Sequence, residues 1–468
     1  MSYKDTKYHR LDSKILILGF GSVGQAIVPL LLHHLEMSPS QVIVLTQDSI
    51  GEAIAKEQGL SFVRELITRN NYLNVLNELM NPGDFLINLS TGISSHDLIK
   101  YCQQKHILYL DACTEPWLDV KPKQHSFHTR YDLRQGVLKL REEHGPTAIL
   151  THGANPGLVS HFIRQALWNM AQDNELSCSL PATPTEWAKL AHTLGIKVIH
   201  IAERDTQVSN RFRVPGEFVN TWSAEGLIAE ASQPAELSWG THERHWPEDA
   251  IHHTFTNDGA VYLKRTGAST RVRTWTPTHG PFYGFLITHA ESLTIADFLT
   301  IKNDREVSYR PTVHYAYYPC PDATLSLQEY EASNWTLEHR NRLIIQDVVE
   351  GTDELGVLLM GNKKGAYWYG SQLSIHEARK LVPYNNATSL QVAAGVLAGV
   401  IWALKNPDRS IVEPEDIDFQ FALQIAWPYL GKVAGYYTRW TPLENRQRLF
   451  PEKLDLSDPW QFLNIRVE

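Results

Sequence analysis

The sequence predicts an α/β protein with an N-terminal doubly wound parallel sheet, a second α+β domain, and C-terminal helices that pack back on the first domain. Three observations support this prediction. The chain has 468 residues, too many for one compact core. Short apolar runs alternate with helical stretches over residues 1–150, as in sheets whose parallel strands are joined by helices. A long apolar helical stretch follows near the C-terminus.

The strands of the first part are predicted from short, continuous apolar runs that each end in a polar or small residue. Parallel strands buried on both faces have this pattern. The stretch VGQAIVPLLLHHL is the helix that follows the first of them. The strand-forming runs are KILILGF, QVIVLTQ, DFLINLS and ILYLDAC.

The first strand ends in three glycines, Gly19, Gly21 and Gly24, spaced G-x-G-x-x-G and followed by the helix. In this context the spacing is the dinucleotide-binding fingerprint of a Rossmann domain. Gly19 allows a tight turn, Gly21 lets the backbone approach a pyrophosphate, and Gly24 allows close packing of the helix. The alternative, a glycine-rich turn without a ligand, does not explain the flanking strand and helix.

The cofactor is predicted to be NAD. Asp48 follows the second strand and is the candidate for binding the adenosine ribose hydroxyls, and residues 46–50 contain no Arg for a 2′-phosphate. The alternative for Asp48 is a turn or helix-capping role. Ligands of open parallel sheets lie at the carboxyl ends of the strands. The expected cofactor contacts are Gly19, Gly21, Ser22, Val23, Gly24, Asp48, Asn88, Ser90, Thr91, Asp111 and Ala112.

The remaining chain is divided into two parts. Residues 151–385 have mixed periodicity and many aromatic residues, which indicates an α+β domain. Residues 386–468 are expected to be a helical segment that returns to the first domain. Its strongest helix is LQVAAGVLAGVIWALK, with Ser389 as the expected N-cap. This stretch is shorter than a membrane span, so we expect a buried helix and no membrane association.

Composition disfavours several function classes. A net charge of −9 argues against a nucleic-acid-binding surface, which would be basic, and permits a cationic substrate. The four cysteines lack paired spacing and the N-terminal residues lack an apolar signal region, so a cytoplasmic location is expected. The 21 histidines show no metal-ligand spacing, and no metal is expected.

Several motifs resemble one family when they are taken together and in order. They span nearly the whole chain, and THGANPGLVSHF is far more specific than the glycine loop. The resemblance is to bacterial homospermidine synthases, which are saccharopine dehydrogenase-like proteins. The motifs are ILILGFGSVGQAIVPLL, NLSTGISS, YLDACTEPW, ILTHGANPGLVSHF, NTWSAEG, GPFYGFLITHAESLTIADFL and DELGVLLMG.

The resemblance implies an activity. Such enzymes join two putrescines, or spermidine and putrescine, into sym-homospermidine and release ammonia or diaminopropane. An amine is oxidised to an imine, a second amine exchanges into it, and the retained NADH reduces the product, so the enzyme is formally an NAD-dependent aminoalkyl transferase. The resemblance also implies a homodimer, with residues 151–385 as the substrate-binding and dimerisation domain.

Roles for single residues follow from matching motif to motif. Trp222 is expected to face an ammonium or iminium through its ring, since Trp is the best cation–π partner. Glu203 and Glu230 are expected to hold or deprotonate amines, and His289 to carry protons. Asn155 is expected to orient an amine near the nicotinamide and to contact the cofactor.

Two further acids, Glu115 and Asp353, are expected to bind the distal ammonium groups of the substrate. The main alternative function is an imine reductase of the saccharopine dehydrogenase or carboxynorspermidine synthase type. That enzyme would need arginines to pair with substrate carboxylates, and Arg204 and Arg211 lie near the acidic motifs. A second alternative is a non-catalytic NAD-binding protein.

Overall fold

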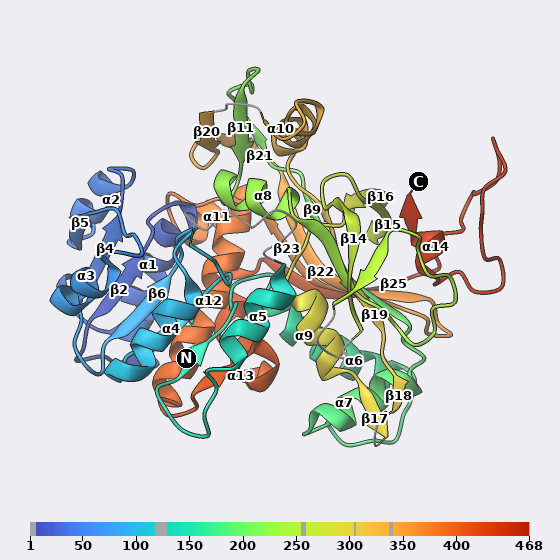
Figure 1. Cartoon of the computed structure of the whole chain (residues 1–468), viewed down its shortest axis with the longest axis horizontal. Helices are drawn as coiled ribbons and strands as arrows, with labels where there is room; N and C mark the ends of the chain where they lie inside the picture. The colour runs from blue at the N-terminus through green and yellow to red at the C-terminus, as the bar shows by residue number, and fades with distance from the viewer. Residues whose placement is uncertain (1–5, 118–128, 254–258, 304–305, 337–339, 468) are drawn as a thin grey trace.

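The computed structural model describes residues 6–117, 129–253, 259–303, 306–336 and 340–467. Two sheets lie side by side, with the first at the left of Figure 1 and the second at the right. Helix α12 (Ala387–Lys405) stands between them. The predicted α/β class, with a second mixed domain, is confirmed.

The first sheet is parallel throughout and has seven strands in the order β5-β4-β2-β6-β7-β8-β24. The order reverses between β2 and β6, which is the switch point where doubly wound sheets bind ligands. The strands are β2 Ile15–Leu18, β4 Val42–Thr46, β5 Ser61–Arg64, β6 Phe85–Asn88, β7 Leu108–Asp111, β8 Ala148–Ile149 and β24 Ile411–Val412.

Both faces of this sheet are covered. Alternate residues of β2 enter different cores: Ile15 and Ile17 pack with α1 and α12, whereas Leu16 and Leu18 pack with α3 and α4. Continuous apolar runs are therefore required in these strands. The helices are α1 Ser22–His34, α2 Glu52–Glu57, α3 Tyr72–Leu79, α4 Ser95–Lys105 and α5 Arg130–Leu138.

The second sheet is mixed, with the main path β13-β14-β12-β19-β9-β22-β23-β25; β15, β16 and β26 extend it. Only β9 and β19 are paired in parallel among the strands that the structure describes here. The strands are β9 Val198–Asp205, β12 Pro234–Ser238, β13 Ala250–His252, β14 Ala260–Thr266, β15 Arg271–Thr276, β16 Gly280–Phe285, β19 Thr312–Tyr318, β22 Thr352–Met360, β23 Ala366–Ser374, β25 Lys432–Thr438 and β26 Arg466–Val467.

Smaller elements complete the molecule. The lobe at the top of Figure 1 contains α8, α10 and the short sheets β11–β20 and β10–β21. The elements are α6 Leu158–Asp173, α7 Pro184–Thr193, α8 Ala224–Ala231, α9 Glu291–Phe298, α10 Pro321–Ala332, α11 Ile375–Leu381, α13 Phe419–Ala426, α14 Phe462–Ile465, β1 His9–Arg10, β3 Leu35–Glu36, β10 Val208–Ser209, β11 Glu217–Asn220, β17 Ile301–Asn303, β18 Glu306–Tyr309, β20 Arg340–Leu343 and β21 Val348–Glu350.

Helix α12 is apolar because it is buried. It is the one helix among the described residues that is long and apolar enough to cross a membrane. Of its most apolar 18-residue stretch, however, 89% is buried inside the protein. Cβ atoms at Gly395 and Gly399 would collide with Gly153 and Leu110, so the glycines permit the close approach of this helix. The predicted N-cap, Ser389, is wrong: Asn386 caps the helix and accepts from the Ser389 amide at 2.8 Å.

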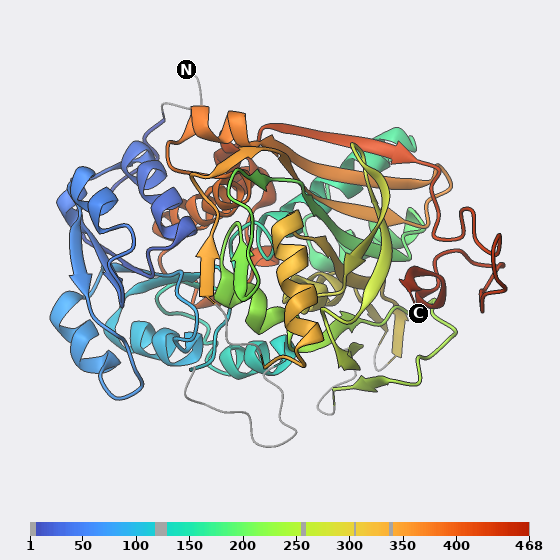
Figure 2. The same ribbon diagram turned by 90° about the horizontal axis from the view of Figure 1, so that it is seen from above.

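The segment 386–468 is only partly the helical segment that we expected. Helix α12 packs on α1, and β24 joins the edge of the first sheet. Strands β25 and β26, however, pair with β23 and β15 in the second sheet. Figure 2 shows the red strand β25 beside the orange strands of this sheet. The expectation of a helical segment is wrong for the residues of β25, which form a strand at the edge of the second sheet. Their side chains alternate between more and less exposed positions, a strand pattern that the sequence prediction overlooked.

Candidate active site

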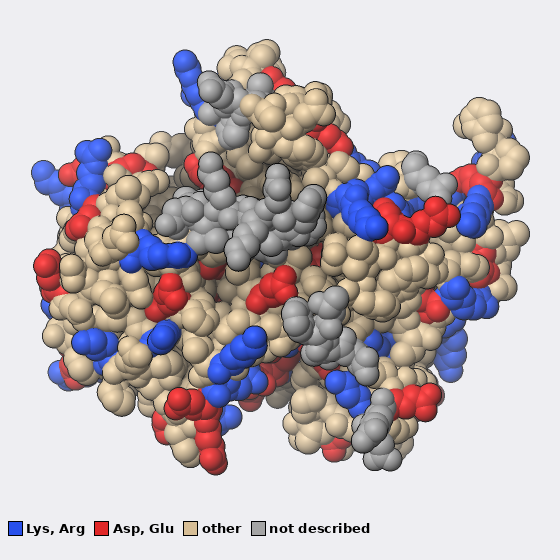
Figure 3. Space-filling model, viewed as in Figure 1, with Lys and Arg blue, Asp and Glu red and all other residues tan. Residues whose placement is uncertain are grey.

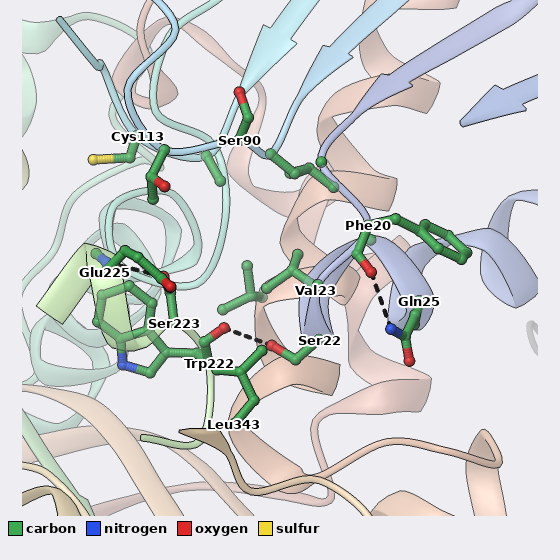
Figure 4. A pocket seen from close by; sticks show the side chains of 18 of the residues that line it. Phe20, Ser22, Val23, Gln25, Ser90, Cys113, Trp222, Ser223, Glu225 and Leu343 are labelled. Carbon is green, nitrogen blue, oxygen red and sulfur yellow. Dashed lines mark hydrogen bonds between the residues drawn. The ribbon is translucent and has the colours of Figure 1, made fainter. Parts of the chain in front are cut away.

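One cavity of about 990 Å³ lies between the two sheets. Its wall combines the glycine loop and strand ends of the first sheet with α8, β20 and the inner face of the second sheet. In Figure 4, Ser90 and Cys113 lie on the side opposite Trp222 and Leu343. The predicted site residues in its lining are Gly19, Gly21, Ser22, Val23, Gly24, Asp48, Asn88, Ser90, Thr91, Ala112, Glu115, Asn155, Glu203, Trp222, Glu230 and His289.

The glycine loop has the geometry that a dinucleotide requires. Gly19 has a φ of +86°, and a Cβ there would lie 2.9 Å from the Leu89 carbonyl oxygen. A Cβ at Gly24 would lie 2.7 Å from the Gly19 carbonyl oxygen, so this glycine packs the helix against its own loop. Gly21 has no comparable obstruction, and its bare backbone faces the cavity at the start of α1. Backbone N–H groups at such a helix start bind phosphate.

The second domain closes over this loop. The Ser22 hydroxyl donates a hydrogen bond to the Trp222 carbonyl oxygen at 2.6 Å (Figure 4). The Leu343 side chain of β20 lies 3.8 Å from the position of a Gly21 Cβ. A dinucleotide held by the loop would therefore be covered by residues of both domains.

Asp48 lies where the ribose-binding acid was expected, at the end of β4 and in the cavity wall. Its Oδ1 accepts a hydrogen bond from the Ile50 amide at 2.7 Å, so it also stabilises the turn before α2. Asn88 stabilises the end of β6, because its side chain accepts a hydrogen bond from the Ser90 hydroxyl at 2.6 Å.

Asp111 does not line the cavity, and its predicted contact with the cofactor is not supported by its position. The carboxylate is fully buried and accepts from the Thr151 amide at 2.6 Å and from the Tyr109 hydroxyl at 2.9 Å. Burial raises the pKa of Asp111 to about 6. Its side chain thus joins β7 to the start of the 151–157 loop, and the neighbouring Ala112 faces the cavity instead.

Glu203 is a buried carboxyl on β9 of the second sheet, and it lines the cavity. Its Oε2 accepts from Asn155 Nδ2 at 2.8 Å and from the Tyr315 hydroxyl, which leaves Oε1 for a ligand. Burial raises the pKa of Glu203 to about 8, although both donors favour the charged form. At neutral pH the side chain is therefore mostly protonated in the empty cavity, and a nearby cation would ionise it.

Aromatic rings continue this wall. Tyr315 and Tyr317 lie on the same face of β19 and stack, with ring centroids 5.0 Å apart and planes 9° apart. Trp222 Nε1 donates to the Tyr317 hydroxyl at 3.2 Å and the indole lines the cavity. The indole is thus held in one orientation, with its apolar surface available to a cation.

Glu230 and His289 form a second charged group. His289 Nε2 lies 3.0 Å from Glu230, and its Nδ1 lies 3.1 Å from Glu291. Burial alone would lower the pKa of His289, but the two carboxylates raise it to about 10. Arg130 also donates to Glu230 at 2.9 Å, and these two cations hold the pKa of Glu230 below its usual value despite burial. His289 is therefore a fixed cation near neutral pH, unlike the proton carrier that we expected.

The two acids expected to bind distal ammonium groups are placed differently. Glu115 lines the cavity, and one oxygen lies 3.9 Å from Arg130. Asp353 does not line it: the side chain is fully buried and accepts from the Thr388 hydroxyl at 2.6 Å. Direct contact of Asp353 with a substrate is not supported, because Thr388 occupies the cavity wall instead.

Sequence reasoning missed Tyr315, Arg130 and Thr388. The alternation in TVHYAYY could have placed Tyr315 and Tyr317 on one face of a strand, but not beside Glu203. Arg130 and Thr388 reach the site through α5 and α12, whose positions depend on the tertiary fold.

No group of three or more His, Cys, Asp or Glu residues in the described part of the chain has a metal-binding arrangement. Acidic and basic side chains are mixed over the face seen in Figure 3, which shows no large patch of one charge among the described residues. The cavity itself is lined by acids, aromatic rings and the glycine loop.

These features define the class as a two-domain, dinucleotide-dependent enzyme. Two family models match: the Saccharopine dehydrogenase NADP binding domain over residues 15–149 and the Saccharopine dehydrogenase C-terminal domain over residues 153–438. The homospermidine synthase of Blastochloris viridis is 47% identical over 472 residues, covering 98% of each chain. That of Mesorhizobium japonicum is 47% identical over 473 residues, covering 98% of this chain and 97% of the relative.

A solved structure agrees with these sequence relatives. The crystal structure of the homospermidine synthase of Legionella pneumophila in complex with NAD is 55% identical, has a TM-score of 0.93, and covers 98% of each chain. The chain therefore belongs to the homospermidine synthase family, within the saccharopine dehydrogenase-like proteins.

Proposed function

We propose that the protein is a homospermidine synthase that uses NAD to transfer an aminobutyl group between diamines. It joins two putrescines, or spermidine and putrescine, into sym-homospermidine with release of ammonia or diaminopropane. One observation carries this proposal: the cavity beside the glycine loop presents Glu203, Glu230 and Trp222, which suit a cationic substrate.

The cofactor would be held by the glycine loop, Asp48 and the strand ends at Asn88 to Thr91. NAD, when bound, supplies the hydride chemistry, and the protein supplies position and electrostatics. Ser22 and Leu343 place the second domain over the loop, which favours retention of the cofactor between the two half-reactions.

Hydride loss requires a neutral amine, so the substrate ammonium must first give a proton to a base. We propose Glu203 as that base. An entering ammonium lowers the pKa of Glu203, so the carboxyl first releases its own proton to the solvent, and its free Oε1 then accepts a proton from the substrate ammonium. Asn155 and Tyr315 fix the opposite oxygen and so orient the carboxylate.

Trp222 is proposed to stabilise the ammonium or iminium by a cation–π contact. Glu230 would bind a second nitrogen of the substrate, and Glu115 would hold a distal ammonium. His289 would keep Glu230 ionised and oriented rather than cycle its proton, since its pKa is about 10.

The rival function, an imine reductase acting on a keto acid, needs arginines free to bind a carboxylate. The two arginines in the described lining, Arg211 and Arg342, are each within 3 Å of Glu217. Arg342 also binds Asp347 at 2.7 Å. Arg204, named above as a further candidate, lies over the rings of Phe282 and Tyr318.

The test is incubation of the purified protein with putrescine and sub-stoichiometric NAD, followed by chromatography of the amines and an ammonia assay. We expect homospermidine and ammonia in excess of the NAD present. Untouched putrescine, together with NADH oxidation that requires a keto acid or aldehyde and an amine, would establish the reductase instead.

We also propose that the protein acts as a cytoplasmic homodimer. The family resemblance supports the dimer, and the free state of all four cysteines is compatible with a reducing compartment. Light scattering coupled to size exclusion tests the dimer: a mass near twice 53.2 kDa is expected.

A further inference from the structure

Two aspartates lie behind the cavity wall without a place in the mechanism above. Asp205 on β9 and Asp353 on β22 are register partners in an antiparallel pair, and both side chains are fully buried. Side chains of directly opposed residues point to the same face, with Cβ atoms about 5 Å apart. We call these two residues the carboxyl pair.

The hydrogen bonds of the carboxyl pair are unequal. Asp205 accepts from the Gln207 amide at 2.8 Å, from the Gln207 side chain at 3.0 Å and from the Thr221 hydroxyl at 3.0 Å. Asp353 accepts only from the Thr388 hydroxyl, and its Oδ1 has no partner among the described residues. Three donors favour an ionised Asp205, whereas the unpartnered oxygen of Asp353 suits a protonated carboxyl.

No cation in the described part of the chain balances two charges here. None of the Lys, Arg or His residues that the structure describes forms an ion pair with either aspartate. The other titratable groups that act on the pair are Glu203, Tyr317, Cys320 and Glu354, all of them acidic or neutral. Burial raises the pKa of both aspartates, and the carboxylates of Glu203, when it is ionised, and of Asp205 raise that of Asp353 further. Repulsion between two buried carboxylates at this separation favours a state in which only one of them is ionised.

Thr388 connects the carboxyl pair to the cavity. Its hydroxyl lies 2.6 Å from Asp353 and 3.4 Å from Asp205, and the residue lines the cavity. A cation beside Thr388 would be within a few ångströms of the pair, in an environment where charges are weakly screened.

We propose that Asp205 and Asp353 share one proton in the empty enzyme and release it when an alkylammonium ion occupies the cavity beside Thr388. In this step a carboxyl O–H bond breaks, the proton passes to the buffer, and the second carboxylate is neutralised by the bound ammonium. The pair thereby determines specificity for charge, since a neutral analogue cannot drive the ionisation. The identity of the ligand rests on the proposed function.

Calorimetric titration of the NAD-loaded protein with putrescine at pH 7, in buffers of different ionisation enthalpy, counts the protons released. We expect the Asp353→Asn variant to release about one proton fewer than the wild type, because it lacks the carboxyl that holds the shared proton while the three donors keep Asp205 ionised. The Glu203→Gln variant lacks the proton that Glu203 itself would release, and so separates that proton from the one shared by the carboxyl pair. Glu415→Gln is the matched control, since Glu415 is a half-buried residue outside the cavity whose carboxyl pKa is raised to about 7 by desolvation.

An equal proton count in the wild type and Asp353→Asn would overturn the proposal while leaving the function intact. Failure of putrescine to bind the wild type would instead contradict the proposed function. The shared proton is then tested without ligand, by the infrared band of protonated carboxyl groups at pH 7. Loss of part of that band in Asp353→Asn supports the pair, and an unchanged band overturns it.

Discussion

Asn155, in the loop that leaves the first sheet, donates a hydrogen bond to Glu203 of the second sheet at 2.8 Å. This contact ties the loop between β8 and α6 to the second sheet, at the point where the cavity passes from the glycine loop to the acidic wall. The carboxyl that we assign as the base is therefore oriented by the segment that connects the two domains. Mutations in either domain are expected to affect the same chemical step.

Replacing Glu203 with Gln is expected to lower kcat by about 10²- to 10⁴-fold, the usual contribution of a general base. In the wild type, kcat/KM should rise with pH as Glu203 ionises, with an apparent pKa near 8. Steady-state kinetics across pH 6–9 measures both effects. Glu243→Gln is the control, since Glu243 is a buried glutamate with a pKa raised to about 7 outside the cavity.

Glu203 also makes stability depend on pH. Its folded pKa lies above the value of about 4.3 expected in the unfolded chain, so its stabilising contribution is complete at low pH and is lost as pH rises through 8. The Tm of the wild type should therefore fall relative to that of Glu203→Gln between pH 5 and pH 8. A constant difference in Tm over this range would contradict the assignment.

Trp222→Ala is expected to lower kcat/KM for putrescine about 5- to 30-fold, equivalent to ~1–2 kcal/mol for a partly desolvated cation–π contact. Trp222→Phe should keep part of the effect, because it retains a ring but loses the hydrogen bond to Tyr317. Trp246→Phe is the control, as Trp246 is 43% exposed and lies outside the cavity. Equal kinetics in all three variants would remove Trp222 from the mechanism.

The glycines of the loop predict two different defects. A Cβ at Gly21 meets nothing nearer than 3.8 Å, so Gly21→Ala should keep the wild-type Tm yet weaken NAD binding at least tenfold. A Cβ at Gly24 would lie 2.7 Å from the Gly19 carbonyl oxygen, so Gly24→Ala should lower both the Tm and the affinity for NAD. Fluorescence titration with NAD and thermal melting separate the cases. A lowered Tm in Gly21→Ala would show that this glycine is structural.

We expect the protein to lose stability in acid because of two buried histidines, His152 and His161. Their Nε2 atoms lie 2.9 Å apart, and burial lowers the pKa of both histidines, that of His152 to about 4. Between pH 6.5 and 4 the unfolded state binds more protons, so stability falls as pH falls, by up to ~1.4 kcal/mol per pH unit for each histidine. Denaturant unfolding at pH 7, 6 and 5 measures this slope.

The control for this prediction is His144→Gln, an exposed histidine whose replacement should leave the slope unchanged. His161→Gln should make the slope shallower, although the variant is itself less stable. A slope equal to that of the wild type in His161→Gln would assign the acid sensitivity to other groups.

The local parts of the site were predictable from sequence because their patterns are local. The glycine spacing fixes the loop within six residues, and the strand ends follow from where apolar runs stop. Asp111 was misassigned because the direction of a side chain at a strand end depends on its partners, here the Thr151 amide. No property of the run LYLD shows that partner.

The remaining site depends on contacts between distant residues. Tyr315 meets Glu203 because β19 pairs with β9, and these residues are 112 positions apart. Asp353 was misassigned for a related reason: Thr388, at the start of α12, stands between it and the cavity. Sequence motifs indicated which residues matter chemically, but the packing of α12 determines whether Asp353 reaches the substrate space.

The last strand of the first sheet, β24, is formed by residues 411 and 412, although its neighbour β8 ends at residue 149. While the ribosome synthesises the intervening chain, the edge of β8 is open and α1 lacks the cover of α12. Open sheet edges and bare apolar helices promote aggregation of nascent chains. The N-terminal domain therefore completes its fold only after most of the second domain has emerged, and a gene truncated before β24 should yield insoluble protein.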